Sequence, residues 1–414
     1  MTPFPAVSTA PVTGVGPSAA RALTAEFARH NAATTALVIG ADHASAVVAA
    51  AIEALLPGDN LTLVAGVRST ADLLRDHIAG LGSWVSDRVR ILDSLAEASP
   101  ADVVILGEPL TGTADETRAV LDSLGKYLTE GAVVSVATPA VPGRTGGAAA
   151  ELFRQSALFG VGTDLVARNQ PPLRVHRLRF SQADTRVAAT LAPAYRPSSV
   201  PVTRTMHIDS NGVAAAGIAL GLAALARSAR PKSKLWLLPA LAALPVAAFF
   251  RDPERDIPAD ANAIVAASDG RVLSVERLTD ERLGEGEFLR IAVFLSVLDV
   301  HVNRVPVAGR VTDYFVIDGG YANAMTAAAE HNVAAYTVLD TDHGTVAVAQ
   351  RTGLIARRIV QRTPVGTLVA RGERMGLIRF GSRTDVYLPA DRAEATVAVG
   401  DKVIGASSVI ARWI

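Results

Sequence analysis

The chain has 414 residues, with 40 Lys and Arg balanced by 40 Asp and Glu, and it contains no cysteine. This length predicts two or three folded units, and the balanced charge gives no overall positive field that would favour nucleic acid as a partner. The absence of cysteine excludes disulfides, Cys-ligated zinc and thiol nucleophiles. Half of the residues are hydrophobic but only 5% are aromatic, and this excess of aliphatic side chains suggests that part of the chain contacts lipid.

The N-terminal half predicts a flexible leader followed by an α/β domain. Residues 1–20 are rich in Pro, Ser, Thr and Gly, and they lack the charged and continuous apolar regions of an export signal. Between residues 21 and 195, short runs of Val, Ile and Leu alternate with helix-like stretches, which is typical of a parallel sheet covered by helices. The clearest expected strands lie within 36–42, 60–66, 101–110 and 127–137.

This arrangement resembles a class I S-adenosylmethionine methyltransferase at the level of the fold. The loop after the first strand offers only Gly40 where such a cofactor loop has several glycines, and Val64 to Gly66 provide no acid for the ribose hydroxyls. A degenerate, structural or regulatory domain is therefore favoured over one that holds S-adenosylmethionine. Asp42 and His43 are adjacent, but an exposed loop is favoured over a metal pair, and no metal site is predicted.

The segment 205–252 predicts an apolar hairpin that associates with a membrane. Its two uncharged stretches, 212–226 and 235–250, are both shorter than the roughly 20 residues that cross a bilayer core. The connection between them carries four basic residues, which attract anionic head groups: Arg227, Arg230, Lys232 and Lys234. We favour a shallow or re-entrant contact over two full spans, and a pair of buried core helices remains the alternative.

From residue 253 to 414 the pattern changes to many short β-like runs with turn signals every 8–12 residues, which is typical of an antiparallel sandwich or barrel. Only residues 320–335 are expected to form a helix there. The sequence therefore predicts a multidomain chain with an N-terminal α/β parallel-sheet domain, an apolar hairpin and a mainly-β C-terminal domain.

Four segments of the C-terminal part occur in the order found in phosphatidylserine decarboxylases. They are FFRDPERDIP (249–258), ASDGRV (267–272), LSVLDVHVNRVP (295–306) and GERMGLIRFGSRTDVYLP (372–389). Each segment is weak evidence alone, but together residues 200–414 resemble the short, actinobacterial-like form of this family. The Gly-Ser pair at 381–382, otherwise an ordinary turn dipeptide, matches the centre of the family's processing site.

The resemblance implies that the chain is a proenzyme that cuts itself between Gly381 and Ser382. The Ser382 hydroxyl would attack the Gly381 carbonyl to give an ester, which eliminates and hydrolyses to leave a pyruvoyl group on residue 382. This carbonyl would be the covalent cofactor, because decarboxylation of an amino acid needs an electron sink that unmodified side chains lack. The expected reaction converts phosphatidylserine to phosphatidylethanolamine and CO₂, and the fragment 382–414 is expected to stay with the rest of the chain.

The candidates for activating Ser382 are His301 as the base and Asp269 as the group that orients it, because a serine hydroxyl attacks poorly until a base removes its proton. Longer relatives have two histidines in this segment, whereas here Arg304 stands where the second would fall. Either His301 serves both self-cleavage and decarboxylation, or His331 or His343 takes one role. Asp299 is expected to be a structural partner of His301 or Arg304.

We predict that the protein lies at the cytoplasmic face of the cell membrane, peripheral or shallowly inserted, with phosphatidylserine in an anionic bilayer as its substrate. No nucleic-acid partner is expected, and homo-oligomerisation is left open. Two other functions remain: a membrane-associated S-adenosylmethionine-dependent methyltransferase whose β module is not catalytic, and a non-catalytic membrane scaffold.

Overall fold

The structure is a computed structural model of the chain, and it describes residues 14–66, 71–140, 147–194, 199–354, 358–378 and 382–414. Gly381, on one side of the predicted cut, lies outside the described residues, whereas Ser382 is described. The chain divides into two compact units, one of Met1–Pro197 with Gly366–Leu368 and the other of Ser198–Val365 with Val369–Ile414. Each unit is described by itself below.

The N-terminal unit is built on one seven-stranded sheet with the strand order β3-β2-β1-β4-β5-β7-β6. Its first five strands are parallel, and β7 runs antiparallel to both of its neighbours. The strands are β1 (Thr35–Ala41), β2 (Asn60–Ala65), β3 (Val89–Leu92), β4 (Ala101–Leu106), β5 (Leu128–Pro139), β6 (Gly160–Val166) and β7 (Leu173–Leu178).

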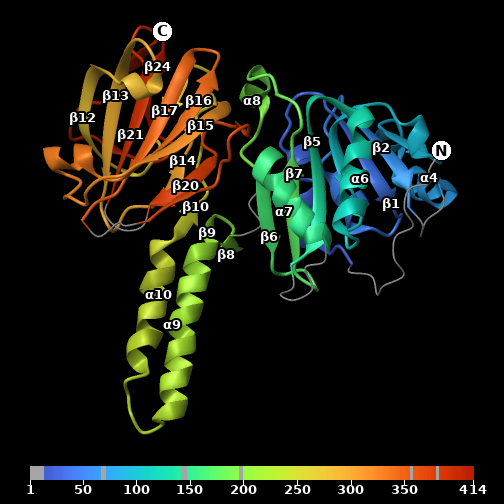
Figure 1. Cartoon of the computed structure of the whole chain (residues 1–414), viewed down its shortest axis with the longest axis horizontal. Coiled ribbons are helices and arrows are strands. Elements are labelled where there is room, and N and C mark those ends of the chain that lie inside the picture. Colours follow the sequence, from blue (N-terminus) through green and yellow to red (C-terminus); the bar gives the residue numbers. More distant parts are fainter. Residues whose placement is uncertain (1–13, 67–70, 141–146, 195–198, 355–357, 379–381) are drawn as a thin grey trace. The chain divides into compact units, whose positions relative to one another are not determined.

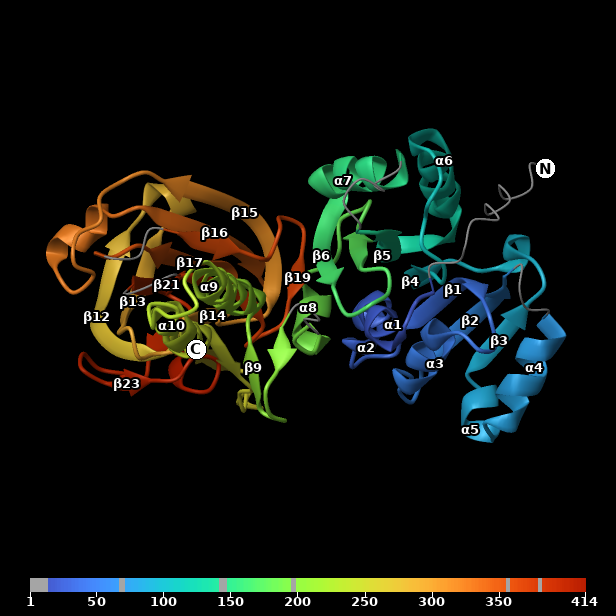
Figure 2. The same cartoon turned by 90° about the horizontal axis from the view of Figure 1, so that it is seen from below.

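Helices cover both faces of this sheet, as Figure 2 shows, with α6 and α7 on one side and α3, α4 and α5 on the other. Each face has its own apolar core, because parallel strands that are buried on both sides carry side chains into two layers. The predicted α/β domain is confirmed, although the first helix already begins inside the predicted leader. The helices are α1 (Pro17–Leu23), α2 (Ala25–Ala28), α3 (Ala46–Glu53), α4 (Ala71–Gly80), α5 (Ser83–Ser86), α6 (Ala114–Leu124), α7 (Gly147–Phe159) and α8 (Arg186–Thr190).

The C-terminal ends of β1, β2 and β4 approach one another through glycine. Gly40 has a φ of +80°, and a Cβ at Gly66 or Gly107 would come within 3.0 Å of the Gly40 backbone. The Gly66 amide donates to Ala41 O and the Gly107 amide to Ile39 O. These strand ends are thus held together by direct backbone contacts that side chains would obstruct.

Two long apolar helices, α9 (Ser210–Ala229) and α10 (Leu237–Phe249), pack against each other as a hairpin (Figure 1). Helix α9 is 20 residues long with a mean hydropathy of 1.6, so by length and composition it could cross a membrane. The prediction that both apolar segments are too short to cross a bilayer is therefore wrong for the first segment, which forms α9. The helix continues beyond its apolar run through Arg227, since a basic side chain in the last turn interacts favourably with the helix dipole.

The C-terminal unit is mainly β, as predicted. Its largest sheet has eight strands in the order β19-β15-β16-β17-β21-β13-β12-β23, and two further three-stranded sheets, β11-β24-β22 and β14-β20-β18, accompany it. The short strands β8 (Val200–Pro201), β9 (Met206–Ile208) and β10 (Arg251–Pro253) lie at the base of the hairpin. The remaining strands are β11 (Ala263–Val265), β12 (Gly270–Thr279), β13 (Glu287–Leu295), β14 (Val302–Arg304), β15 (Gly309–Ile317), β16 (Ala334–Thr341), β17 (Gly344–Arg351), β18 (Ile359–Gln361), β19 (Leu368–Val369), β20 (Arg374–Ile378), β21 (Ser382–Pro389), β22 (Ala393–Ala395), β23 (Lys402–Val403) and β24 (Val409–Trp413).

The helix predicted at 320–335 is wrong, since that segment contains only the short 3-10 helix η4 (Ala327–His331). The side chain of Asn332 explains the difference. It accepts a hydrogen bond from the Ala322 amide and donates to Ala322 O and Thr352 O. These bonds satisfy backbone groups locally and so compete with a continuous helix.

Candidate active site

Ser382 is the first residue of β21, in the middle of the eight-stranded sheet. It pairs with Leu295, the last residue of β13. The residue is fully buried, and its Oγ has no hydrogen-bond partner among the described residues. Buried hydroxyls are normally hydrogen-bonded, so an unpaired one at this position is available for chemistry.

His301 lies beside the strand that leads to Ser382. It directly precedes β14, whose Val302 pairs with Leu377 of β20, and the His301 carbonyl accepts a hydrogen bond of 3.3 Å from the Ile378 amide. The connection from β13 to β14 carries His301, and the connection from β20 to β21 ends at Ser382. Strand pairing therefore brings His301 beside Ile378, the last residue of β20, and brings Ser382 beside Leu295, the last residue of β13.

The surroundings of His301 fix its protonation. Nδ1 lies 2.9 Å from the carbonyl oxygen of Asp299, and the ring of Phe249 lies 4.2 Å from the imidazole, centroid to centroid. Burial lowers the pKa of His301 to about 4, against the opposing effect of the hydrogen bond to Asp299. Because a carbonyl only accepts, the neutral ring carries its proton on Nδ1. The Nε2 lone pair is then free, and this atom is buried without a partner among the described residues.

Asp269 is held by groups other than the imidazole. Both of its carboxylate oxygens accept hydrogen bonds of 2.8 Å from Arg255, and one of them also accepts from the Gly405 amide at 2.8 Å. The neighbouring Ser268 Oγ lies 2.7 Å from Thr384 Oγ1 of β21. Asp269 is therefore fixed close to the strand of Ser382, and its negative charge acts on His301 through space, tending to raise the pKa of that histidine.

The other two candidate histidines lie elsewhere in the unit. His331 ends η4 and is exposed. His343 lies in the turn between β16 and β17, stacked on Trp413 with centroids 4.3 Å apart. That turn is at the opposite end of β17 from Arg351, which pairs with Arg383 next to Ser382. Of the three histidines, only His301 is attached to the strands around Ser382.

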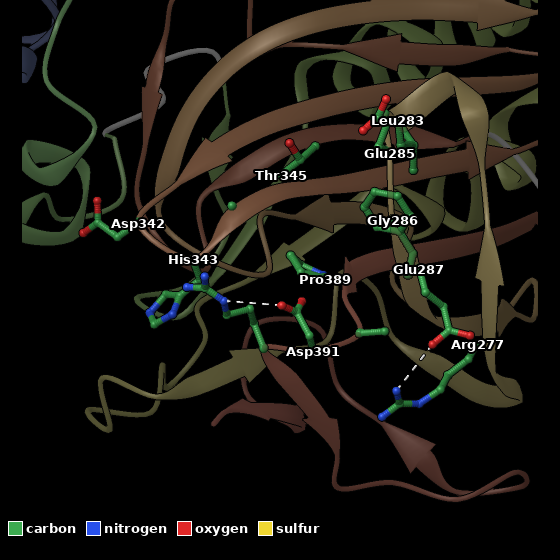
Figure 3. A pocket seen from close by; sticks show the side chains of 15 residues that line it. Arg277, Leu283, Glu285, Gly286, Glu287, Asp342, His343, Thr345, Pro389 and Asp391 are labelled. Carbon is green, nitrogen blue, oxygen red and sulfur yellow. Dashed lines mark hydrogen bonds and ion pairs between the residues drawn. The ribbon is translucent and has the colours of Figure 1, made fainter.

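A cavity of about 640 Å³ opens at the far end of the same sheet (Figure 3). Its lining includes Glu287, the first residue of β13, Gly344, the first of β17, and Pro389, the last of β21. Ser382 lies seven residues from Pro389 along one strand, about 23 Å away at the usual rise per residue. The cavity, whose lining includes the ion pair between Arg277 and Glu287, is thus separate from the Ser382 centre.

Comparison with known proteins identifies the C-terminal part. Residues 243–411 match the family model described as phosphatidylserine decarboxylase. A phosphatidylserine decarboxylase proenzyme of Symbiobacterium thermophilum is 48% identical over 166 residues, which are 40% of this chain and 77% of the relative. The proenzyme of Geobacter metallireducens is 45% identical over 164 residues, 39% of this chain and 74% of the relative. The chain belongs to the phosphatidylserine decarboxylase family. The predicted family, carboxy-lyase class and lipid decarboxylation are confirmed.

Solved structures similar to this chain include methyltransferases. Mitomycin 7-O-methyltransferase MmcR has a TM-score of 0.29 and 18% identity over 39% of this chain and 53% of its own, so the chain spans about half of MmcR. A methyltransferase from Pyrococcus furiosus has a TM-score of 0.32 and 17% identity over 40% of this chain and 83% of its own. The fold of the N-terminal unit rests instead on its own strand order and directions, described above.

A buried network of charges ties the start of β21 to the rest of the decarboxylase unit, on the sheet face opposite the Ser382 side chain. Asp385 accepts from Arg383 Nε at 2.5 Å and from Arg351 Nε at 2.7 Å, and Arg383 also pairs with Glu330 at 2.8 Å. Arg351 and Glu330 precede residue 382, whereas Arg383 and Asp385 follow it. These ion pairs would still join the two fragments after a cut before Ser382.

Sequence reasoning missed two residues of this centre, Phe249 and Arg255. Both lie in the segment FFRDPERDIP, which the family resemblance singled out without assigning roles. Phe249 is the last residue of α10 and packs on His301, and Arg255 holds Asp269. The sequence feature that could have pointed to these two residues was the position of this segment directly after the apolar hairpin.

Replacing Asp269 with Asn is expected to slow self-cleavage about tenfold, because a negative charge near His301 stabilises the imidazolium that forms when the ring accepts a proton. The effect is moderate because Arg255 offsets part of the charge. The rate of fragment release from freshly synthesised protein measures it. Asp260→Asn is the matched control, since Asp260 pairs with Arg412 at the surface; an unchanged rate in Asp269→Asn would show that the carboxylate only anchors Arg255 and Gly405.

Proposed function

We propose that the chain is a phosphatidylserine decarboxylase proenzyme that cuts itself between Gly381 and Ser382, converts residue 382 to a pyruvoyl group and then produces phosphatidylethanolamine and CO₂. One observation carries this proposal: Ser382 Oγ and His301 Nε2 are both buried and unpaired among the described residues, and they belong to one unit in which Ser382 begins β21 and His301 directly precedes β14. The mass of the fragment that begins at residue 382 tests it, because a pyruvoyl terminus is lighter than a serine terminus by one ammonia molecule.

His301 Nε2 is the base that removes the proton of Ser382 as the hydroxyl attacks the preceding carbonyl. Since the Nδ1 proton is held by the Asp299 carbonyl at 2.9 Å, the ring cannot turn its protonated nitrogen toward the serine without losing that bond. Asp269 supports the positive charge that the ring then gains. The low pKa of His301 keeps it neutral, and so able to act as a base, at physiological pH.

A pyruvoyl group at position 382 would fit the chemistry of the residues in this part of the unit. The position is buried, and the same unit holds buried polar atoms that lack partners among the described residues, at His301 Nε2, Asn303 Nδ2 and Gln350 Oε1. When present, the group supplies the electron sink that decarboxylation requires. The chain's own residues supply the buried site, and a neutral imidazole that can hold or return a proton.

We further infer that the hairpin inserts into the membrane from the cytoplasmic side. Its large apolar side chains are exposed, which would be costly in water for so many neighbouring residues: Val213, Ile218, Leu220, Leu222, Leu225, Leu235, Leu238, Leu241 and Leu244. The basic connection between the helices suits anionic head groups and opposes translocation. At the base of the hairpin, Phe249 and Phe250 form a small core with Leu377 of β20, so the hairpin is joined directly to the decarboxylase unit.

Replacing Leu241 and Leu244 together with Asp is expected to lower binding to phosphatidylserine-containing vesicles by about a hundredfold or more, because each buried Leu contributes about 1.5–3 kcal/mol. These side chains are 71% and 77% exposed, so the fold has little to lose. Co-sedimentation with the vesicles measures binding. The matched control replaces Leu158 and Leu165, exposed leucines of the N-terminal unit, with Asp. Equal binding of both double variants would show that the hairpin does not carry the membrane contact.

The alternative of a membrane-associated methyltransferase with a non-catalytic β module is not proposed, since the family match falls on that module. That the N-terminal unit does not hold S-adenosylmethionine stays a prediction. It is supported by the single glycine in the loop after β1 and by the missing acid after β2.

A further inference from the structure

Two buried amide side chains near Ser382 have no role in the mechanism described so far. Asn303 and Gln350 are both fully buried, and they are joined by a short hydrogen bond of 2.6 Å from Gln350 Nε2 to Asn303 Oδ1. This bond leaves Asn303 Nδ2 and Gln350 Oε1 without partners among the described residues. Buried amides that keep unpaired polar atoms destabilise a fold, so such a pair calls for a function.

The strand pattern places this amide pair on the same face as the reacting groups. Residues two apart on a strand point to the same side, so Asn303 lies on the side of His301. Gln350 of β17 pairs directly with Thr384 of β21, and Ser382 is two residues before Thr384. Diagonal neighbours of this kind are within reach of long side chains. The amide pair thus connects β14, which directly follows His301, with β17, the neighbour of the strand that Ser382 begins.

The orientation of the pair determines what it can offer. Because Asn303 Oδ1 is occupied by Gln350, the free atom of Asn303 is its Nδ2, which only donates. His301 Nε2, in contrast, has a lone pair and accepts. The segment from His301 to Asn303 therefore carries an acceptor for the hydroxyl proton and, two residues later in the chain, a donor with no partner among the described residues.

We propose that Asn303 supplies the hydrogen-bond donor that stabilises the oxyanion formed when Ser382 attacks the preceding peptide carbonyl, and that Gln350 positions it. The carbonyl carbon is bonded to the Ser382 nitrogen, about 1.3 Å from it, so the oxyanion forms directly at the described end of β21. In this step the Oγ–C bond forms, the proton passes to His301 Nε2 and the carbonyl oxygen gains the charge. Collapse then breaks the C–N bond, and the proton returns to the leaving nitrogen, giving the ester. This inference rests on the proposed self-cleavage.

The test follows the full chain, made by cell-free synthesis with vesicles of phosphatidylcholine and phosphatidylglycerol, as it separates into two fragments. Asn303→Leu and the smaller Asn303→Ala are expected to slow cleavage by about a hundredfold, the usual effect of removing one oxyanion donor. Hydroxylamine cleaves esters but not amides, so it should not restore cleavage if the ester fails to form. Melting temperatures show which variants fold. If Asn303→Leu does not fold, the cleavage rate of Asn303→Ala decides the test.

Asn332 provides the matched controls, because it is a buried asparagine in the same unit whose amide is fully paired. Asn332→Leu and Asn332→Ala should lower the melting temperature without a comparable loss of rate. A wild-type rate in a folded Asn303 variant, equal slowing in the Asn332 controls, or full rescue by hydroxylamine would each overturn the role of Asn303. Fragment release from Ser382→Ala would instead overturn self-cleavage itself, so the two failures are distinguishable.

Discussion

Replacing Ser382 with Ala is expected to leave the chain uncut at its full mass of 43.0 kDa and to abolish decarboxylation of phosphatidylserine. Without the hydroxyl there is no nucleophile to attack the preceding carbonyl, and no precursor of the pyruvoyl group. Denaturing gels and mass spectrometry of the purified chain measure the cut, and CO₂ release from phosphatidylserine vesicles measures the activity. The fold should survive, since the Oγ has no hydrogen-bond partner among the described residues.

The control for this experiment is Ser135→Ala. Ser135 is also fully buried, and its Oγ also lacks a partner in the described part of the chain, but it lies in β5 of the N-terminal unit. This variant should be cut and active like the wild type. Release of the fragment 382–414 from Ser382→Ala, or decarboxylation by that uncut variant, would contradict the proposed processing site.

Replacing His301 with Gln is expected to slow self-cleavage by about 10²–10⁴-fold, the usual contribution of a general base. Glutamine is similar in size and polar, but it cannot accept a proton at neutral pH. The rate of appearance of the two fragments in a time course measures the loss. His343→Gln is the matched control, because His343 lies at the other end of the sheet beside the cavity. A rate loss in His343→Gln equal to that in His301→Gln would contradict the assignment.

The same histidine determines the pH dependence. Burial lowers the pKa of His301 from 6.5 to about 4, so the cleavage rate should stay level from pH 8 to about 5 and fall as the pH drops through about 4. Between pH 6.5 and about 4 the unfolded chain binds a proton that folded His301 does not. The folded state therefore loses stability as the pH falls through this window. A rate that titrates near pH 6.5, and does so only when His301 is present, would contradict the buried, neutral imidazole.

The sequence predicted the class of each part because local patterns reflect burial directly. The Val- and Leu-rich runs at 36–42 and 60–66 became β1 and β2 of a parallel sheet, as fully buried strands require. Two local predictions were wrong, because interactions that the local sequence pattern does not show determined the structure there. Asn332 satisfies backbone groups that the predicted helix at 320–335 would have used, and α9 extends past its apolar run to Ala229.

What the sequence determined by itself is the chemistry available to this protein: four family segments in order, a Gly-Ser pair at 381–382 and one histidine at 301. The tertiary structure decided that the segments of His301 and Ser382 adjoin, because about 80 residues separate them in the chain and antiparallel pairing joins β13 to β21 and β14 to β20. Tertiary structure also selected the partners. Asp299 supplies a backbone carbonyl to His301, Arg255 binds the Asp269 carboxylate, and burial, more than any nearby charge, lowers the pKa of the imidazole and keeps it neutral.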